Sequence, residues 1–176
     1  MENDVNSILD NDFRTCKNAG IVLLLPFLNR LFDNLQLTKD GKFINEQKRK
    51  TAVQMLVFLA NGDESQSEQD YLLPNLLCGI ENNELIILDI HLSPKQTEEA
   101  EILLKSVIEH WQVLQNVSVE SFRETFLQRD GKIKVAEKIS LEVETFGIDI
   151  LQENLSWGYR IYKLPWMNKV IETQWY

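Results

Sequence analysis

The residues best suited to metal or nucleophilic chemistry in this sequence are two histidines, His91 and His110, and two cysteines, Cys16 and Cys78. None of them forms a close ligand pair such as Cys-x-x-Cys or His-x-x-x-His, the spacing that many structural metal sites use. Cys78 and His91 could share a metal, but a small buried thiol and a histidine beside the end of a strand is the simpler interpretation. The spacing therefore predicts no metal site.

The other candidates for acid–base chemistry also lack suitable partners. His110 lies beside Trp111, one position off an apolar helical stripe, which is typical of a boundary histidine, and the sequence supplies no nucleophile nearby. Glu98, Glu99 and Glu101 form a carboxylate cluster, but acids in the first turns of a helix are stabilised by its dipole. The seven glycines are scattered through turns and helix ends, which does not favour a phosphate-binding loop. We expect a protein that is not an enzyme and uses no cofactor.

Composition and charge restrict the class of partner. The chain has 176 residues, of which 44% are apolar and 26% charged. That is ordinary for one globular domain, which buries roughly 70% of its unfolded surface at this size. The formal net charge of −9 argues against nucleic acid, since binding a phosphate backbone needs a basic surface. The one basic cluster, residues 48–50, precedes apolar residues in helical phase and is interpreted as a solvated helix face.

The sequence also bears on compartment and membrane. Residues 1–5 lack the basic region and apolar core of a secretory signal, and the two cysteines are widely spaced, so a reducing compartment fits best. The apolar stretch 19–28 offers ten residues before Asn29 and Arg30. A membrane-spanning helix needs about 20. The sequence therefore predicts no membrane span.

That apolar stretch raises a question that the sequence leaves open. Pro26 cannot donate a backbone hydrogen bond and predicts a kink or a helix restart. Beyond it, residues 27–35 place their apolar side chains on one helical stripe. Before it, residues 21–25 are apolar on every side and must be enclosed completely, either by the chain's own core or by a partner.

The remaining periodicities predict helices first and strands last. Helices are expected over 45–60, around the apolar run 71–80, from Ser93-Pro94 onward and after Ser118, with a loop at 63–70. Alternating patterns then predict the two strands of a hairpin, over 132–135 and 139–144. A short helix over 148–154 and two further strands, over 159–164 and 170–175, are expected after it. The fold class is α+β, with helices in the N-terminal two-thirds and a small antiparallel sheet, a hairpin plus C-terminal strands, at the end. We expect a polar segment 1–17 and a single α+β domain 18–176.

Aromatic side chains gather near the C-terminus. Six tryptophans and tyrosines lie within 20 residues, and three of them flank the last strand: Trp157, Tyr159, Tyr162, Trp166, Trp175 and Tyr176. Aromatic anchors are favoured at protein interfaces because they bury a large area at little entropy cost. They are equally expected in a sheet that packs its aromatics against its own helices. Both interpretations can hold at once.

Several stretches together resemble the tape measure proteins of contractile injection systems, the phage-tail-like particles and type VI-like secretion machines of bacteria. They are Asn-Ala-Gly-Ile-Val-Leu-Leu-Leu-Pro-Phe-Leu-Asn-Arg-Leu-Phe at 18–32, Leu-Leu-Cys-Gly at 76–79, Ala-Glu-Ile-Leu-Leu-Lys-Ser-Val-Ile-Glu-His-Trp at 100–111, Ser-Phe-Arg-Glu-Thr-Phe-Leu-Gln-Arg-Asp-Gly at 121–131 and Leu-Pro-Trp-Met at 164–167. The matching segment in that family is its C-terminal domain. Their order and spacing make the set specific.

The resemblance implies a structural protein that assembles with tube, cap, spike or baseplate proteins. Assembly is expected in the bacterial cytoplasm, and the chain is expected to be part of the contractile particle. An oligomer of the chain within the particle is compatible with this role. It brings no catalytic residue and no cofactor. Family members that act as rulers carry long additional sequence before this segment, whereas 17 residues precede it here. A fully helical chain would reach only about 260 Å, so we expect docking, linked to tube and sheath length control, more than measurement by this chain alone. The residues expected at the contact are Ile21, Leu24, Leu25, Phe27, Trp166, Met167 and Trp175.

A rival hypothesis comes from another class of protein. The acidic surface also suits a free-standing adaptor or immunity-like module that covers a basic partner. Salt-sensitive capture of one basic protein, without particle proteins, would favour this rival. Capture together with tube, sheath or baseplate proteins would favour the assembly component.

Overall fold

Most of the helical residues lie in the N-terminal two-thirds of the described chain and most of the strand residues near its end, in a computed structural model that describes residues 13–64, 67–81 and 89–175. The helical elements are η1 (Ala19–Leu24), α2 (Leu25–Asn34), α3 (Glu46–Asn61), α4 (Glu68–Leu77), α5 (Pro94–His110), η2 (Gln112–Leu114), α6 (Val119–Phe122), η3 (Arg123–Leu127) and η4 (Gly147–Asn154). The strands are β1 (Arg14–Cys16), β2 (Thr38–Lys39), β3 (Lys42–Phe43), β4 (Gly131–Val135), β5 (Ile139–Val143), β6 (Ile161–Tyr162) and β7 (Ile171–Gln174). The α+β class is confirmed.

Local capping chemistry begins α5 and both begins and ends α3 where the sequence predicts. Ser93 Oγ accepts a hydrogen bond from Gln96 N at 3.2 Å, and Gln96 Oε1 accepts one from Ser93 N at 2.8 Å, which closes the capping box of α5. Asn45 Oδ1 accepts from Lys48 N at 2.8 Å at the start of α3. Gly62 follows α3 with φ of 74°, a left-handed conformation that glycine adopts without strain.

The apolar run around Pro26 divides as expected. Residues 19–24 form the 3₁₀ helix η1, and α2 begins at Leu25 with Pro26 in its first turn, where a missing N–H donor costs nothing. The run is also packed against a neighbouring backbone. A Cβ added to Gly20 would lie 1.7 Å from the carbonyl oxygen of Phe126, so only glycine fits there.

The five-stranded sheet has the order β1-β4-β5-β7-β6. The hairpin β4–β5 is confirmed, and its register pairs Ile133 with Leu141. Three of the four strand pairings are antiparallel, but β5 and β7 run parallel, with Ile139 opposite Ile171, so the sheet is mixed. Strand β1 pairs with β4 and comes from residues 14–16. These residues lie in the polar segment 1–17, which is expected from the sequence to precede the domain.

Other boundaries differ from expectation. Residues 68–70 belong to α4, so the predicted loop 63–70 is wrong at its end. Acids there lie in the first turn of α4, where the dipole stabilises them. The segment 147–154 is a 3₁₀ helix, and residues 123–127 continue α6 as a π-helical turn. The strand expected before His91 falls largely on residues 82–88, outside the described residues.

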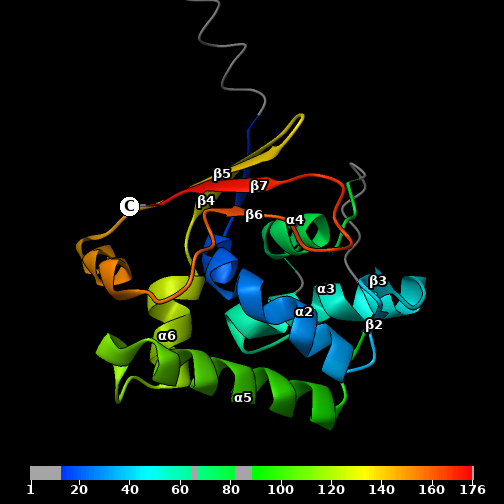
Figure 1. Ribbon diagram of the computed structural model, residues 1–176, viewed down its shortest axis with the longest axis horizontal. Helices are drawn as coiled ribbons and strands as arrows, with labels where there is room; N and C mark the ends of the chain where they lie inside the picture. The colour runs from blue at the N-terminus through cyan, green and yellow to red at the C-terminus, as the bar shows by residue number, and fades with distance from the viewer. Residues whose placement is uncertain (1–12, 65–66, 82–88, 176) are drawn as a thin grey trace, which may run out of the picture.

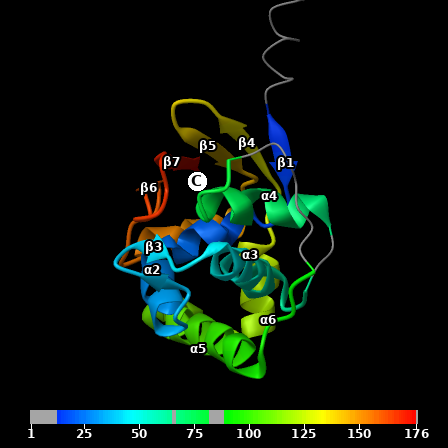
Figure 2. The same ribbon diagram turned by 90° about the vertical axis from the view of Figure 1, so that its right-hand side faces the viewer.

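The elements stack from the sheet down to α5 around one core. The sheet lies across the top of the view in Figure 1, η1 and α4 lie beneath it, and α5 runs along the bottom below α2 and α3. Figure 2, turned by 90°, shows the same order from sheet to α5. The fully buried side chains between these layers include Ile21, Phe32, Tyr71, Trp111 and Phe126. Among the described helices, none joins the length to the apolar character that crossing a membrane requires.

Candidate docking surface

Both cysteine thiols are buried and unreactive in character. Cys16 is 1% exposed, and burial raises the pKa of its thiol to about 12. Cys78 is fully buried, and burial raises the pKa of its thiol, although Arg49 opposes the shift. A thiolate is the nucleophile and the metal ligand. At neutral pH neither cysteine is therefore suited to either task.

The histidines make local hydrogen bonds at the surface. His91 Nδ1 lies 2.7 Å from Glu64 Oε2, and the hydrogen bond and charge of Glu64 raise the pKa of His91. Glu64 Oε1 also accepts a hydrogen bond from Leu92 N, which with His91 lowers the pKa of Glu64. His110 Nδ1 lies 2.7 Å from Ser106 O in its own helix. Within the described residues, no group of three or more His, Cys, Asp or Glu side chains is arranged to hold a metal ion.

Three of the expected contact residues lie inside the core. Ile21, Leu24 and Leu25 are each 0% exposed, so the chain itself encloses the apolar run before Pro26. Trp157 closes over this run, because its Nε1 donates a hydrogen bond to Leu23 O at 2.9 Å. Of the two ways to enclose the run that the sequence leaves open, the structure has the chain's own core.

Trp175 and Met167, expected at the last turn, are also covered. Met167 is 4% exposed and Trp175 is 2% exposed. Trp175 Nε1 donates a hydrogen bond to Asp149 Oδ2 at 3.0 Å, and Asp149 accepts two more from the guanidinium of Arg129 at 2.7 and 2.8 Å. The indole is thus hydrogen-bonded to a buried ion pair, and this bond joins η4 to the end of β7.

Trp166 keeps a partly exposed ring beside the small hairpin β2–β3. Its Nε1 donates to Leu77 O at 2.8 Å, at the C-terminal end of α4. Its ring packs on Phe32 at 5.5 Å and on Phe43 at 5.0 Å between centroids, and the guanidinium of Arg49 lies 5.3 Å from the Phe43 ring centre. These aromatic rings make a rigid, half-open patch over α2, α3 and α4, which we call the Trp166 patch.

Phe27 lies at the edge of an open groove between α2 and α5. The groove has a volume of about 500 Å³, and its apolar lining includes Phe27 and Leu31 from α2 and Ile102 and Leu103 from α5. Ile102 is 49% exposed. The ring of Phe27 meets Trp157 edge-on at 5.2 Å. The two helices lie one above the other in Figure 1 and remain neighbours in Figure 2.

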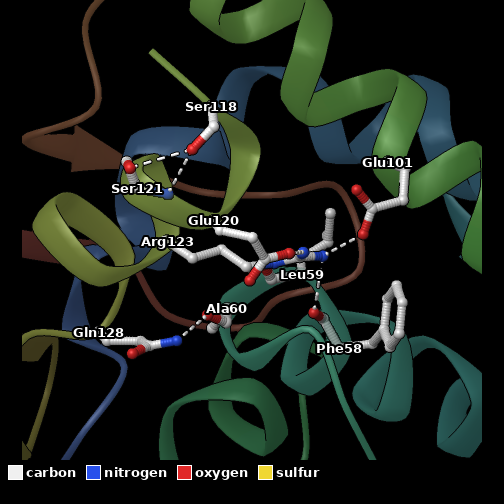
Figure 3. Close-up of polar contacts among 9 residues, drawn as sticks. All are labelled: Phe58, Leu59, Ala60, Glu101, Ser118, Glu120, Ser121, Arg123 and Gln128. Atoms are coloured by element: carbon white, nitrogen blue, oxygen red, sulfur yellow. Dashed lines mark hydrogen bonds and ion pairs between the residues drawn. The ribbon is translucent and has the colours of Figure 1, made fainter.

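A buried arginine holds α5 in place behind this groove. Arg123 is 1% exposed, and its Nε donates a hydrogen bond to Leu59 O at 3.0 Å, while its Nη2 lies 2.6 Å from Glu101 Oε1 (Figure 3). The sequence predicts Glu101 to be a charge at the start of the helix. This prediction is wrong, because Glu101 is an ion-pair partner of Arg123. A cation at the last carbonyls of α3 is also favoured by the helix dipole.

Two neighbours complete this network. Glu120 pairs with Arg123 at 3.1 Å, and Gln128 Nε2 donates to Ala60 O at 3.0 Å, as Figure 3 shows. Sequence reasoning missed Arg123, because arginine is usually exposed. A usable signal was its place among Phe122, Phe126 and Leu127, which share one inward face.

A family model for contractile injection system tape measure proteins matches residues 3–175. This span covers all the helices and strands described above. No curated protein and no solved structure matches the chain.

Proposed function

The chain belongs to the contractile injection system tape measure family, and from that premise we propose that it docks onto a tube, cap, spike or baseplate protein while the particle assembles in the bacterial cytoplasm. The family match over residues 3–175 is the observation that carries the proposal, and it makes the chain a structural component related to tape measures. The proposed role is cohesion and docking, without a catalytic centre. Its link to tube and sheath length control is part of the same proposal.

Two of the expected contact residues support docking at the surface. Phe27 and Trp166 are partly exposed aromatic side chains held by fixed neighbours, which lowers the entropy cost of binding through them. Ile21, Leu24, Leu25, Met167 and Trp175 lie inside the chain, where they keep the elements behind these contacts rigid. Our proposal therefore places direct contact at Phe27 and at the Trp166 patch.

Deleting the gene and imaging the particles tests the role. We expect fewer particles, altered tube and sheath length, or particles lacking a tube-end component, counted by electron microscopy and mass spectrometry. Particles of normal number, length and composition would contradict the proposal.

Purification of the tagged chain separates the proposal from its rival. Tube, sheath or baseplate proteins should co-purify with it, and Phe27→Ala should weaken this association more than Ile150→Ala. The second change removes a side chain of 52% exposure on η4, which neither lines the groove nor belongs to the Trp166 patch. Salt-sensitive capture of a single basic protein, with no particle protein present, would instead identify an acidic adaptor.

A further inference from the structure

The groove between α2 and α5 is the described surface whose shape and charge most closely define a partner. We propose that it binds one amphipathic helix of another protein of the particle, and this inference rests on the proposed function. Two helices that lie side by side leave a channel that a third helix can fill, as in other helix-in-groove interfaces. Since α2 has ten residues, it provides a wall about 15 Å long, enough for roughly three helical turns of the partner.

The floor and walls supply apolar contacts at helical spacing. Phe27 and Leu31 lie four residues apart on α2, and Ile102 and Leu103 face the same groove from α5. Leu31 is 5% exposed and forms the floor, whereas Ile102 at 49% exposure is the side chain with most surface left to bury. An apolar stripe at i, i+3 or i+4, and i+7 matches these positions.

Charged residues in the groove predict which charged side chains the partner helix carries. Arg30 lines the groove from α2 and Glu99 lines it from α5, and neither makes an ion pair or side-chain hydrogen bond with any described residue. A partner helix with a carboxylate facing Arg30 and a basic side chain facing Glu99 would pair both. These opposite charges restrict which helices the groove can bind.

The net charge of the chain disfavours a second copy as the partner. Each copy has a formal net charge of −9, so two copies repel each other. The groove also needs one charge of each sign beside an apolar stripe. We therefore commit to a different protein of the particle.

Photocrosslinking in the full chain tests the inference directly. Ile102 is replaced by p-benzoylphenylalanine in cells that assemble the particle, and the matched control carries the same residue in place of Ile150, which is 52% exposed. We expect position 102, and not position 150, to crosslink to one segment of a particle protein. That segment should have apolar residues at helical spacing with an acidic and a basic residue beside them.

Charge exchange then tests the pairing. With the crosslinked protein purified, Ile102→Asp should weaken binding at least about tenfold, as expected for a central interface residue, while Ile150→Asp should leave binding unchanged. Arg30→Glu should weaken it, and replacing the partner's facing carboxylate by lysine should restore it. The three changed side chains, Ile102, Ile150 and Arg30, are all exposed, and circular dichroism spectra would verify that the variants fold.

The possible failures separate the groove from the wider role. A crosslink to a second copy, or no crosslink while the chain still co-purifies with particle proteins, would overturn the groove proposal and leave the proposed function standing. Unchanged binding by Ile102→Asp would also overturn it. If no particle protein co-purified with the unmodified chain, the proposed function itself would be overturned.

Discussion

Replacing Asp149 by asparagine should destabilise the fold strongly, because it removes one charge from a buried pair and leaves the other. Asp149 is 0% exposed and Arg129 is 3% exposed, and the two make a bidentate contact. The same carboxylate accepts hydrogen bonds from Phe146 N at 2.8 Å and from Trp175 Nε1. Asparagine keeps the shape, but its side chain is uncharged and has a single acceptor oxygen. The guanidinium therefore loses its counter-charge.

The expected cost is about 3–5 kcal/mol, the range for breaking a buried ion pair on one side. Domains have a total stability of about 5–15 kcal/mol, so Asp149→Asn should remove a large part of it. For a chain of this size each kcal/mol lowers the melting temperature by about 2–4 °C, which predicts a fall of about 6–20 °C. Urea unfolding followed by circular dichroism measures the free energy, and a thermal melt measures the shift.

A second ion pair supplies the control. Lys138 Nζ lies 2.5 Å from Glu172 Oε2, but both side chains are well exposed, at 52% and 39%. Glu172→Gln should therefore cost less than about 1 kcal/mol. If Asp149→Asn cost no more than Glu172→Gln, the reasoning from burial would be refuted. An Arg129→Met, Asp149→Leu double variant should recover part of the loss, because it leaves no unpaired charge, although Phe146 N and Trp175 Nε1 then lack their acceptor.

Acid should reveal the same pair. Burial alone would raise the pKa of Asp149, but hydrogen bonds from Arg129, Phe146 N and Trp175 outweigh it and hold the pKa below its ordinary value of 3.8. A carboxyl whose pKa is lower in the folded state stabilises the fold above its unfolded value. This contribution should be complete above about pH 5 and should disappear as the pH falls through and below 3.8. Asp149→Asn should flatten that part of the stability curve.

Three further predictions concern single positions. Gly20→Ala should prevent stable folding, since its Cβ would lie 1.7 Å from Phe126 O, and the variant's circular dichroism spectrum and solubility would show it. Cys16, whose thiol pKa burial raises to about 12, should resist a thiol reagent at pH 8 until urea unfolds the chain; rapid native labelling would contradict its burial. Glu64 raises the pKa of His91, so their contact should stabilise the fold fully below His91's ordinary value of 6.5 and lose this contribution as the pH rises through its folded pKa. Glu64→Gln should move the NMR titration of His91 back toward 6.5.

Local chemistry explains what the sequence could predict. The capping box at Ser93 and the left-handed turn at Gly62 depend on residues within a few positions, so the start of α5 and the end of α3 follow from the sequence. The hairpin β4–β5 likewise follows from alternation over neighbouring residues. Each of these features needs no knowledge of distant parts of the chain.

Long-range contacts explain what the sequence could not predict. Arg123 pairs with Glu101, 22 residues away, and Arg129 with Asp149, 20 residues away, and arginine alone gives no sign that it will be buried. The parallel pairing of β5 with β7 depends on how the intervening η4 and β6 route the chain. The α2–α5 groove arises in the same way, since its walls are about 70 residues apart.

The place of β7 in the sheet has a consequence for synthesis on the ribosome. Residues 171–174 emerge after every other described strand, yet β7 lies between β5 and β6 and is the strand that β6 pairs with. The helical layer can therefore condense earlier, but the outer half of the sheet closes only after residues 171–174 have emerged. A nascent chain interrupted a few codons earlier would expose the unpaired edge of β5, a surface open to aggregation.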